Sequence, residues 1–128
     1  MEHPVSGRSF RDLDVWQVAM TLADRVYDLT ERFPRHELYG LTSQLRRSAG
    51  SIPSNIAEGT RQRTSKGKAY YYAAANASEA ELETHLELSR RRKYVSEQDI
   101  RDAEELATRV SKMLFKLIES LGNDSGRE

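Results

Sequence analysis

The chain has 128 residues, of which 38% are hydrophobic and 31% are charged, and its 20 basic residues balance its 20 acidic ones. This length fits one domain with one core, the charge content is typical of helical bundles, and the lack of cysteine excludes disulfides and thiolate chemistry. No apolar run is long enough to cross a bilayer and no export signal is visible, so we expect a cytoplasmic protein without a membrane contact.

The first predicted helix runs from about Asp12 to Arg32 and ends before Pro34, because the residue preceding a proline avoids helical geometry. Its apolar residues form two stripes, of which the first contains Val15, Val18, Leu22, Val26, Leu29 and Phe33, and the second Leu13, Trp16, Met20, Ala23 and Tyr27. A helix that lines one core needs only one stripe. The pattern predicts either a contact with another subunit, involving Val18 or Met20, or one wide face in a thick core.

The second predicted helix spans about Glu37 to Gly59, since glycine favours a helix stop. Beside its apolar arc lies a polar arc of short hydrogen-bonding and charged side chains, namely Gln44, Arg47, Ser48, Ser51, Asn55 and Glu58. Arg47 and Glu58 are too far apart to pair on one helix, so we expect each to find a partner on another helix or subunit. We interpret the arc as a network that locks helices together, with ligand binding as the alternative.

The third predicted helix starts at Thr64 or Ser65 and continues to about Arg92, with an alanine-rich first half that permits close helix approach. Ser96, with an acidic residue three positions later, predicts the start of a fourth helix that ends at Gly122. Four amphipathic helices with short connections predict an all-α, antiparallel up-down-up-down four-helix bundle over residues 10–122. We expect flexible arms at residues 1–9 and 123–128.

Parts of three predicted helices resemble the four-helix bundle proteins encoded within intervening sequences of bacterial 23S rRNA genes. The carrying motifs are Leu41-Thr42-Ser43-Gln44-Leu45-Arg46-Arg47, Ser51-Ile52-Pro53-Ser54-Asn55-Ile56-Ala57-Glu58-Gly59, the opening Phe10-x-x-Leu13-x-Val15-Trp16, and Ala75-x-Ala77-Ser78-x-x-Glu81-Leu82-Glu83-Thr84. The resemblance covers Phe10 to about Leu121. It departs at Arg90-Arg91-Arg92-Lys93-Tyr94, where the family pattern reads Leu-Gly before an aromatic residue.

The resemblance implies a left-handed four-helix bundle that assembles as a homo-oligomeric ring, a homopentamer. It also implies a relative, the accessory variability protein of diversity-generating retroelements. That relative is a pentameric barrel that binds nucleic acid and a partner reverse transcriptase. We therefore expect self-association, contact with RNA or DNA, and a protein partner of the reverse-transcriptase kind.

A basic block precedes three consecutive tyrosines in the middle of the chain. Arginine and lysine neutralise phosphates and tyrosine stacks on unpaired bases, so the block predicts a nucleic-acid-binding surface. Its residues are Arg46, Arg47, Arg61, Arg63, Lys66 and Lys68, followed by Tyr70 and Tyr71. The alternative is a solvated face. The run from Arg90 to Lys93 is either a second contact or a helix C-terminus that favours cations.

Catalytic and metal-binding patterns are weak. Glu81 and His85 share one helical face but would supply only one edge of a metal site, and no phosphate-binding glycine loop is present. We therefore predict a protein without enzymatic activity or cofactor that binds RNA or DNA through its basic surface as a homo-oligomer. The alternative is a protein–protein scaffold ring without nucleic-acid binding.

Overall fold

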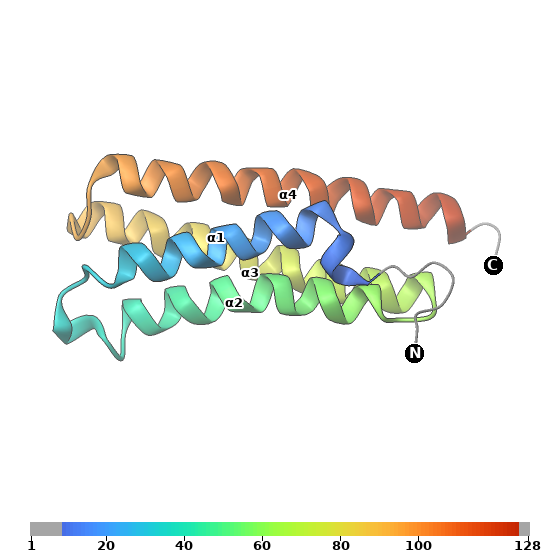
Figure 1. Cartoon of the computed structure of the whole chain (residues 1–128), viewed down its shortest axis with the longest axis horizontal. Helices are drawn as coiled ribbons and strands as arrows, with labels where there is room; N and C mark the ends of the chain where they lie inside the picture. The colour runs from blue at the N-terminus through green and yellow to red at the C-terminus, as the bar shows by residue number, and fades with distance from the viewer. Residues whose placement is uncertain (1–8, 126–128) are drawn as a thin grey trace.

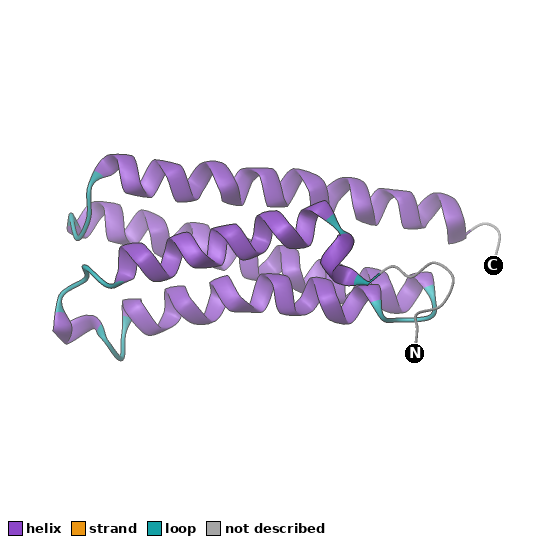
Figure 2. Cartoon of the chain, viewed as in Figure 1, coloured by secondary structure: helices purple, strands orange, loops and turns teal. Residues whose placement is uncertain are grey.

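The computed structural model describes residues 9–125, which form four α-helices lying side by side and contain no strand (Figures 1 and 2). The elements are η1 (Phe10–Asp12), α1 (Asp14–Thr30), η2 (Arg35–Glu37), α2 (Leu41–Thr60), α3 (Ser65–Arg92) and α4 (Glu97–Ser125), where η denotes a 3-10 helix. The all-α class and the four predicted helices are confirmed within this range. None of these helices combines the length and the apolar character needed to span a bilayer.

Several helix ends differ from the prediction. α1 begins at Asp14, because the separate helix η1 and an extended residue precede it. α2 begins at Leu41 rather than Glu37, because the Glu37 carboxylate caps the helix instead of joining it. α4 continues past Gly122 to Ser125, since a glycine inside a helix costs only about 1 kcal/mol.

The predicted arms fall largely outside the described residues. Residues 1–8 and 126–128 lie outside that range. Ser9 caps η1, because its hydroxyl accepts the Arg11 amide N–H at 3.1 Å, and the backbone of residues 123–125 belongs to α4.

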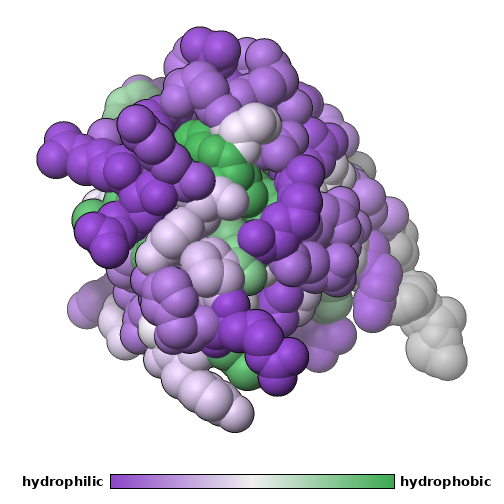
Figure 3. Space-filling model, turned by 90° about the vertical axis from the view of Figure 1, so that its left-hand side faces the viewer, coloured by the Kyte–Doolittle hydropathy of each residue, from purple (hydrophilic) through white to green (hydrophobic). Residues whose placement is uncertain are grey.

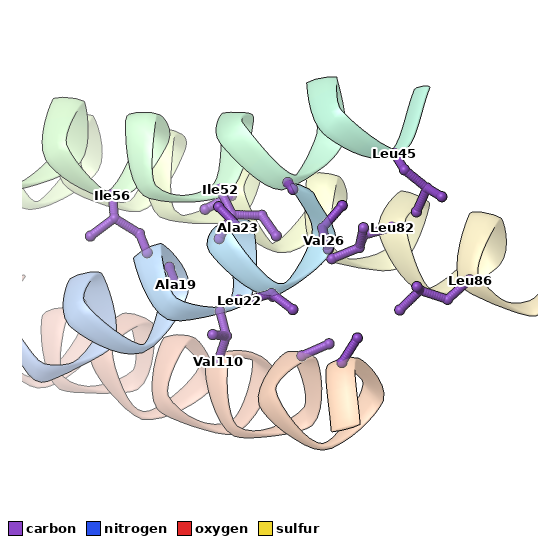
Figure 4. Packing of buried hydrophobic residues seen from close by; sticks show 14 of the residues in the cluster. Ala19, Leu22, Ala23, Val26, Leu45, Ile52, Ile56, Leu82, Leu86 and Val110 are labelled. Atoms are coloured by element: carbon purple, nitrogen blue, oxygen red, sulfur yellow. The ribbon is translucent and has the colours of Figure 1, made fainter. Parts of the chain in front are cut away.

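The core is the space that the four helices enclose (Figure 4). The first apolar stripe of α1 supplies it: Leu22 and Val26 are fully buried there, and only Val18 in that stripe is half-buried. The second stripe behaves differently, because Met20 and Tyr27 remain 37% and 47% exposed. α1 therefore has one core face and one apolar surface next to it.

Gly59 lies inside α2 and lets α3 approach closely. A Cβ atom at Gly59 would lie 2.6 Å from Cε1 of Tyr72, a distance that real contacts do not reach. The Tyr72 hydroxyl in turn lies 3.0 Å from Oγ1 of Thr60, the last residue of α2. The role predicted for Gly59 was wrong: it makes room for a ring, and the helix ends one residue later.

Two interhelical connections meet at one end of the bundle, on the left in Figure 1. The rings of Phe33 and Tyr94, one from each connection, lie 5.2 Å apart. The Glu37 carboxylate accepts the Leu41 amide N–H at 2.9 Å and the Tyr94 hydroxyl at 2.7 Å, and these hydrogen bonds lower its pKa. Seen from this end, hydrophilic side chains surround a small apolar strip (Figure 3).

Arg90 joins the end of α3 to α4 through three carboxylates. Its guanidinium donates to Glu104 at 2.8 Å, to Glu87 at 2.6 Å and to Glu97 at 3.1 Å. These bonds, chiefly those to Glu104, raise the pKa of the Arg90 guanidinium above its ordinary value. The first residue of the basic run at the end of α3 is thus an ion-pair hub within the bundle.

Lys93 follows α3 in the left-handed conformation, with φ of 58°. The Lys93 N–H donates to the Arg90 carbonyl at 3.0 Å and the Tyr94 N–H to the Ser89 carbonyl at 3.2 Å, which is the Schellman pattern of helix ends. Glycine is favoured here because a Cβ strains this conformation. Lys93 thus stands where the family pattern has glycine, and among residues 9–125 it is the one non-glycine residue with a positive φ.

Replacing Lys93 with glycine should therefore stabilise the protein. We expect Lys93→Gly to raise the free energy of unfolding by about 1 kcal/mol, measured by urea denaturation. The matched control is Arg92→Gly, one residue earlier and still helical, which should lower it by about 1 kcal/mol. A destabilised Lys93→Gly variant would contradict the strain at this residue.

Glu79 places a carboxyl group on the buried face of α3. It is 3% exposed, and its Oε2 atom has no hydrogen-bond partner among the described residues. Burial, with a smaller contribution from Glu83 one turn later, raises its pKa to about 8. Between about pH 4.5 and pH 8, the Glu79 carboxyl group therefore holds a proton in the folded protein, whereas in the unfolded chain, where its pKa is 4.5, it has lost that proton.

Stability should consequently fall as pH rises from about 4.5 to 8, by at most about 1.4 kcal/mol per pH unit. Glu79→Gln stays neutral, so we expect it to gain stability over the wild type as the pH is raised through this window. Urea denaturation at pH 5, 6.5 and 8 measures the difference. Glu81→Gln, an exposed neighbour on α3, is the control and should follow the wild type. Parallel curves for Glu79→Gln and wild type would contradict the buried proton.

Candidate nucleic-acid interface

The basic residues predicted to form one surface lie in two places. Arg46 and Arg47 are in the first two turns of α2, whereas Arg61 and Arg63 follow its last residue. At about 1.5 Å per residue, roughly 22 Å of helix separates Arg46 from Arg61. The predicted basic block therefore falls into two groups, one at each end of α2.

Three of the predicted binding residues are engaged within the bundle. Arg46 donates from Nε to Oγ1 of Thr30 at 2.9 Å, and its guanidinium lies 4.9 Å from the centre of the Tyr27 ring. Arg47 donates to Oε1 of Gln44 at 2.6 Å. The Lys68 ammonium donates to the last carbonyl of α2, that of Thr60, at 2.9 Å.

The remaining basic residues gather where α2 meets α3. Arg61, Arg63 and Lys66 are exposed on and beside this turn, and η1 adds Arg11. The guanidinium groups of Arg61 and Arg11 both lie over the Phe10 ring, with central carbons 5.5 and 4.8 Å from its centre. We call Arg11, Arg61, Arg63, Lys66, Phe10 and Tyr70 the basic corner.

The tyrosines divide between this corner and the core. Tyr70 is 70% exposed, and its ring packs edge-on against that of the half-buried Tyr71, with centres 5.0 Å apart. Tyr72 is buried, and burial raises the pKa of its hydroxyl. Of these three tyrosines Tyr70 is therefore the most exposed, Tyr71 packs against it, and Tyr72 belongs to the packing of α2 on α3.

The sequence did not predict the part of the corner contributed by η1. Phe10 and Arg11 are adjacent to the first helix in sequence but far from Arg61. Packing of Phe10 against Trp16, with ring centres 5.3 Å apart, directs η1 toward the end of α2. An aromatic–arginine pair just before a helix was the available signal, but only the tertiary contact reveals its meaning.

The charges of the basic corner are not neutralised within the described part of the chain. No carboxylate forms an ion pair with Arg61, Arg63 or Lys66 there. Glu58, at the end of α2, is exposed and likewise unpaired within residues 9–125. The corner thus keeps unpaired cations beside the exposed ring of Tyr70.

The polar arc of α2 forms a smaller network than the sequence indicated. Ser51 and Ser78 join α2 to α3 through their hydroxyls at 2.9 Å, and Asn55 donates to the Ser51 carbonyl at 2.9 Å. This contact has the predicted locking character. Arg47 instead donates to Gln44 on its own helix, and neither Arg47 nor Glu58 makes the predicted contact with another helix within residues 9–125.

An apolar groove of about 380 Å³ runs between α1 and α2. Large side chains of α1 line one side and small residues of α2 the other, and its apolar lining consists of Trp16, Met20, Ala23, Tyr27, Pro53 and Ala57. Of the two residues predicted at a subunit interface, Met20 lies in this groove. Val18 lies outside it and packs against the core.

The residues considered for a metal do not assemble into a site. Glu81 is exposed and His85 is half-buried, with an unpaired Nδ1 atom. Across residues 9–125, no three histidine or carboxylate side chains are arranged to hold a metal ion.

The model of the family described as 23S rRNA-intervening sequence protein matches residues 11–116 of the chain. No curated protein sequence matches it. The fold is similar to the solved structure of a protein of unknown function from the S23 ribosomal protein family of Bacteroides thetaiotaomicron, with a TM-score of 0.76 and 23% identity. The match covers 81% of this chain and 97% of that one, and at this identity it shows the fold alone.

Proposed function

This chain belongs to the 23S rRNA-intervening sequence protein family, and we propose that it binds the phosphate backbone of RNA or DNA through its basic corner, without enzymatic activity. The observation that carries the proposal is the grouping of Arg11, Arg61, Arg63 and Lys66, which form no ion pair with any carboxylate of residues 9–125. When arginine and lysine side chains bind phosphates, the nucleic acid releases its condensed counterions, and this release favours binding.

The exposed ring of Tyr70 favours single-stranded nucleic acid over a duplex. An unpaired base can stack on a free aromatic face, whereas bases in a duplex are already stacked. The Phe10 ring contacts the guanidinium groups of both Arg61 and Arg11, so it keeps two cations close together. The corner thus pairs backbone neutralisation with a platform for one base.

Self-association would strengthen this weak contact. Four cations meet few phosphates, but a homo-oligomeric ring of antiparallel bundles, such as a pentamer, would repeat the corner around its circumference. Repeated sites on one assembly raise the overall affinity without any new contact. The proposed binding form is therefore the oligomer.

Charge reversal tests the corner directly. We expect Arg61→Glu/Arg63→Glu to weaken binding of a fluorescent single-stranded RNA about tenfold or more at low salt, measured by anisotropy. Because about 0.7 counterions are released per phosphate on single strands, the slope of log affinity against log salt should flatten by about 1.4.

The control variant carries the same change in charge on other faces. Arg47→Glu/Arg109→Glu changes two exposed arginines of α2 and α4 outside the basic corner and should bind RNA nearly as the wild type does. Equal losses in both double variants would show that net charge, rather than the corner, determines binding.

The groove between α1 and α2 favours a second candidate function, a protein–protein scaffold. Met20 and Tyr27 keep much of their apolar surface exposed, and apolar surface of this kind is typical of protein interfaces. The groove could hold a neighbouring subunit or a separate partner, such as a reverse transcriptase. In this alternative the ring binds protein and not nucleic acid.

A charge placed in the groove should disrupt the assembly. We expect Met20→Glu to reduce the mass measured by light scattering to that of smaller species, because burying a carboxylate in an apolar contact is costly. Gln17→Glu, which is exposed on α1 and outside the groove, introduces the same charge and should keep the wild-type mass. A wild-type protein that is monomeric at every concentration would exclude both the ring and the scaffold.

A further inference from the structure

A pocket of about 280 Å³ lies at the end of the bundle away from the basic corner, where α1 ends and α2 begins. Its polar lining comprises Thr30, the last residue of α1, Glu31 just after it, Arg35 of η2, and Thr42 and Arg46 of α2. Two guanidinium groups thus line a single small space. Neither of them forms an ion pair within the described part of the chain.

Arg46 is held in place by contacts that leave its charge uncompensated. Its Nε atom donates to the buried Thr30 hydroxyl, and the Tyr27 ring lies under the guanidinium. Neither partner is an acid, and the two terminal nitrogens of Arg46 donate to no atom of residues 9–125. A guanidinium fixed in this way can bind an anion without further ordering of its side chain.

Thr42 adds a polar group without a partner. It is 3% exposed and lines the pocket, yet its hydroxyl makes no hydrogen bond to any described residue. Thr42 also lies in the first turn of the 20-residue helix α2. The Leu41 amide N–H donates to the Glu37 carboxylate there, but the Thr42 and Ser43 amide N–H groups donate to no described residue. Such free N–H groups at a helix N-terminus attract anions.

The remaining walls restrict the ligand further. Phe33 and Leu38 provide an apolar side, and the exposed Glu31 places one carboxylate at the pocket. Glu31 would repel a bare dianion but would accept hydrogen bonds from hydroxyl groups. Guanidinium forks, a free hydroxyl and a helix N-terminus together suit an oxyanion with several acceptor oxygens.

We propose that this pocket binds a phosphate monoester whose organic part carries hydroxyl groups, such as a sugar phosphate. Arg35 and Arg46 bind the phosphoryl oxygens, Thr42 donates to one of them, and Glu31 accepts from a sugar hydroxyl. The phosphoryl group can belong to a free metabolite or to the 5′ end of a nucleic-acid strand. The site is independent of the basic corner, since α2 separates the two.

Calorimetric titration with ribose 5-phosphate, and with ribose as the matched ligand without phosphate, tests the site. We expect saturable binding of the phosphate ester only, weakened about tenfold or more in Arg35→Ala and also weakened in Thr42→Val. Arg47→Ala, an exposed neighbour of Arg46 that does not line the pocket, is the control and should bind as the wild type does. Folding of each variant is checked by its thermal unfolding.

The source of the phosphoryl group is resolved with short RNA strands on the Arg61→Glu/Arg63→Glu protein, in which two charges of the basic corner are reversed. Preference for a 5′-phosphorylated strand over a 5′-hydroxyl strand supports a strand end, and equal weak binding of both supports a free metabolite. Binding of ribose and ribose 5-phosphate alike, or of ribose 5-phosphate by Arg35→Ala as tightly as by wild type, overturns the proposal. So does the absence of any binding of ribose 5-phosphate.

Discussion

The close approach of α2 and α3 is the constraint on which the rest of the structure depends. The Tyr72 ring of α3 lies so close to Gly59 of α2 that a Cβ atom would not fit between them. Further along these two helices, the Ser51 and Ser78 hydroxyls lie 2.9 Å apart. Small residues at these positions let the two helices lie along each other over most of the length of α2. The turn between them, with its cations, is therefore held by both helices rather than by its own sequence.

The zero net charge of the chain conceals an uneven use of its charged groups. At one end of the bundle, Arg90 binds three carboxylates, and Arg32, which follows α1, lies 2.8 Å from Asp99 of α4. These ion pairs join helices and neutralise one another. At the other end, Arg61 and Arg63 find no acid within residues 9–125, so the same composition leaves cations available where a ligand could reach them.

The sequence predicts the helices well because their apolar periodicity, the Ser96 cap and the proline after Phe33 are local signals. It fails where a residue acts through a distant partner. Glu37 reads as the first residue of a helix, but its carboxylate bonds Tyr94, 57 residues away in sequence. Phe10 reads as a flank of the first helix, but its ring meets the Arg61 guanidinium. Spacing along one helix contains no information about such contacts.

The electrostatics of the basic corner depend on how its helix ends combine. The end of α2 carries partial negative charge and the start of α3 partial positive charge, so the two dipoles largely offset each other at the turn. Lys68 shifts this balance, because its ammonium binds the terminal carbonyl of α2, that of Thr60, and so compensates the negative end. With that end satisfied by Lys68, Arg61 and Arg63 are not needed to cap the helix. Their charge is then free for the phosphate of the proposed ligand. Lys68 belongs to the predicted block but acts indirectly, because it caps α2 instead of facing the ligand.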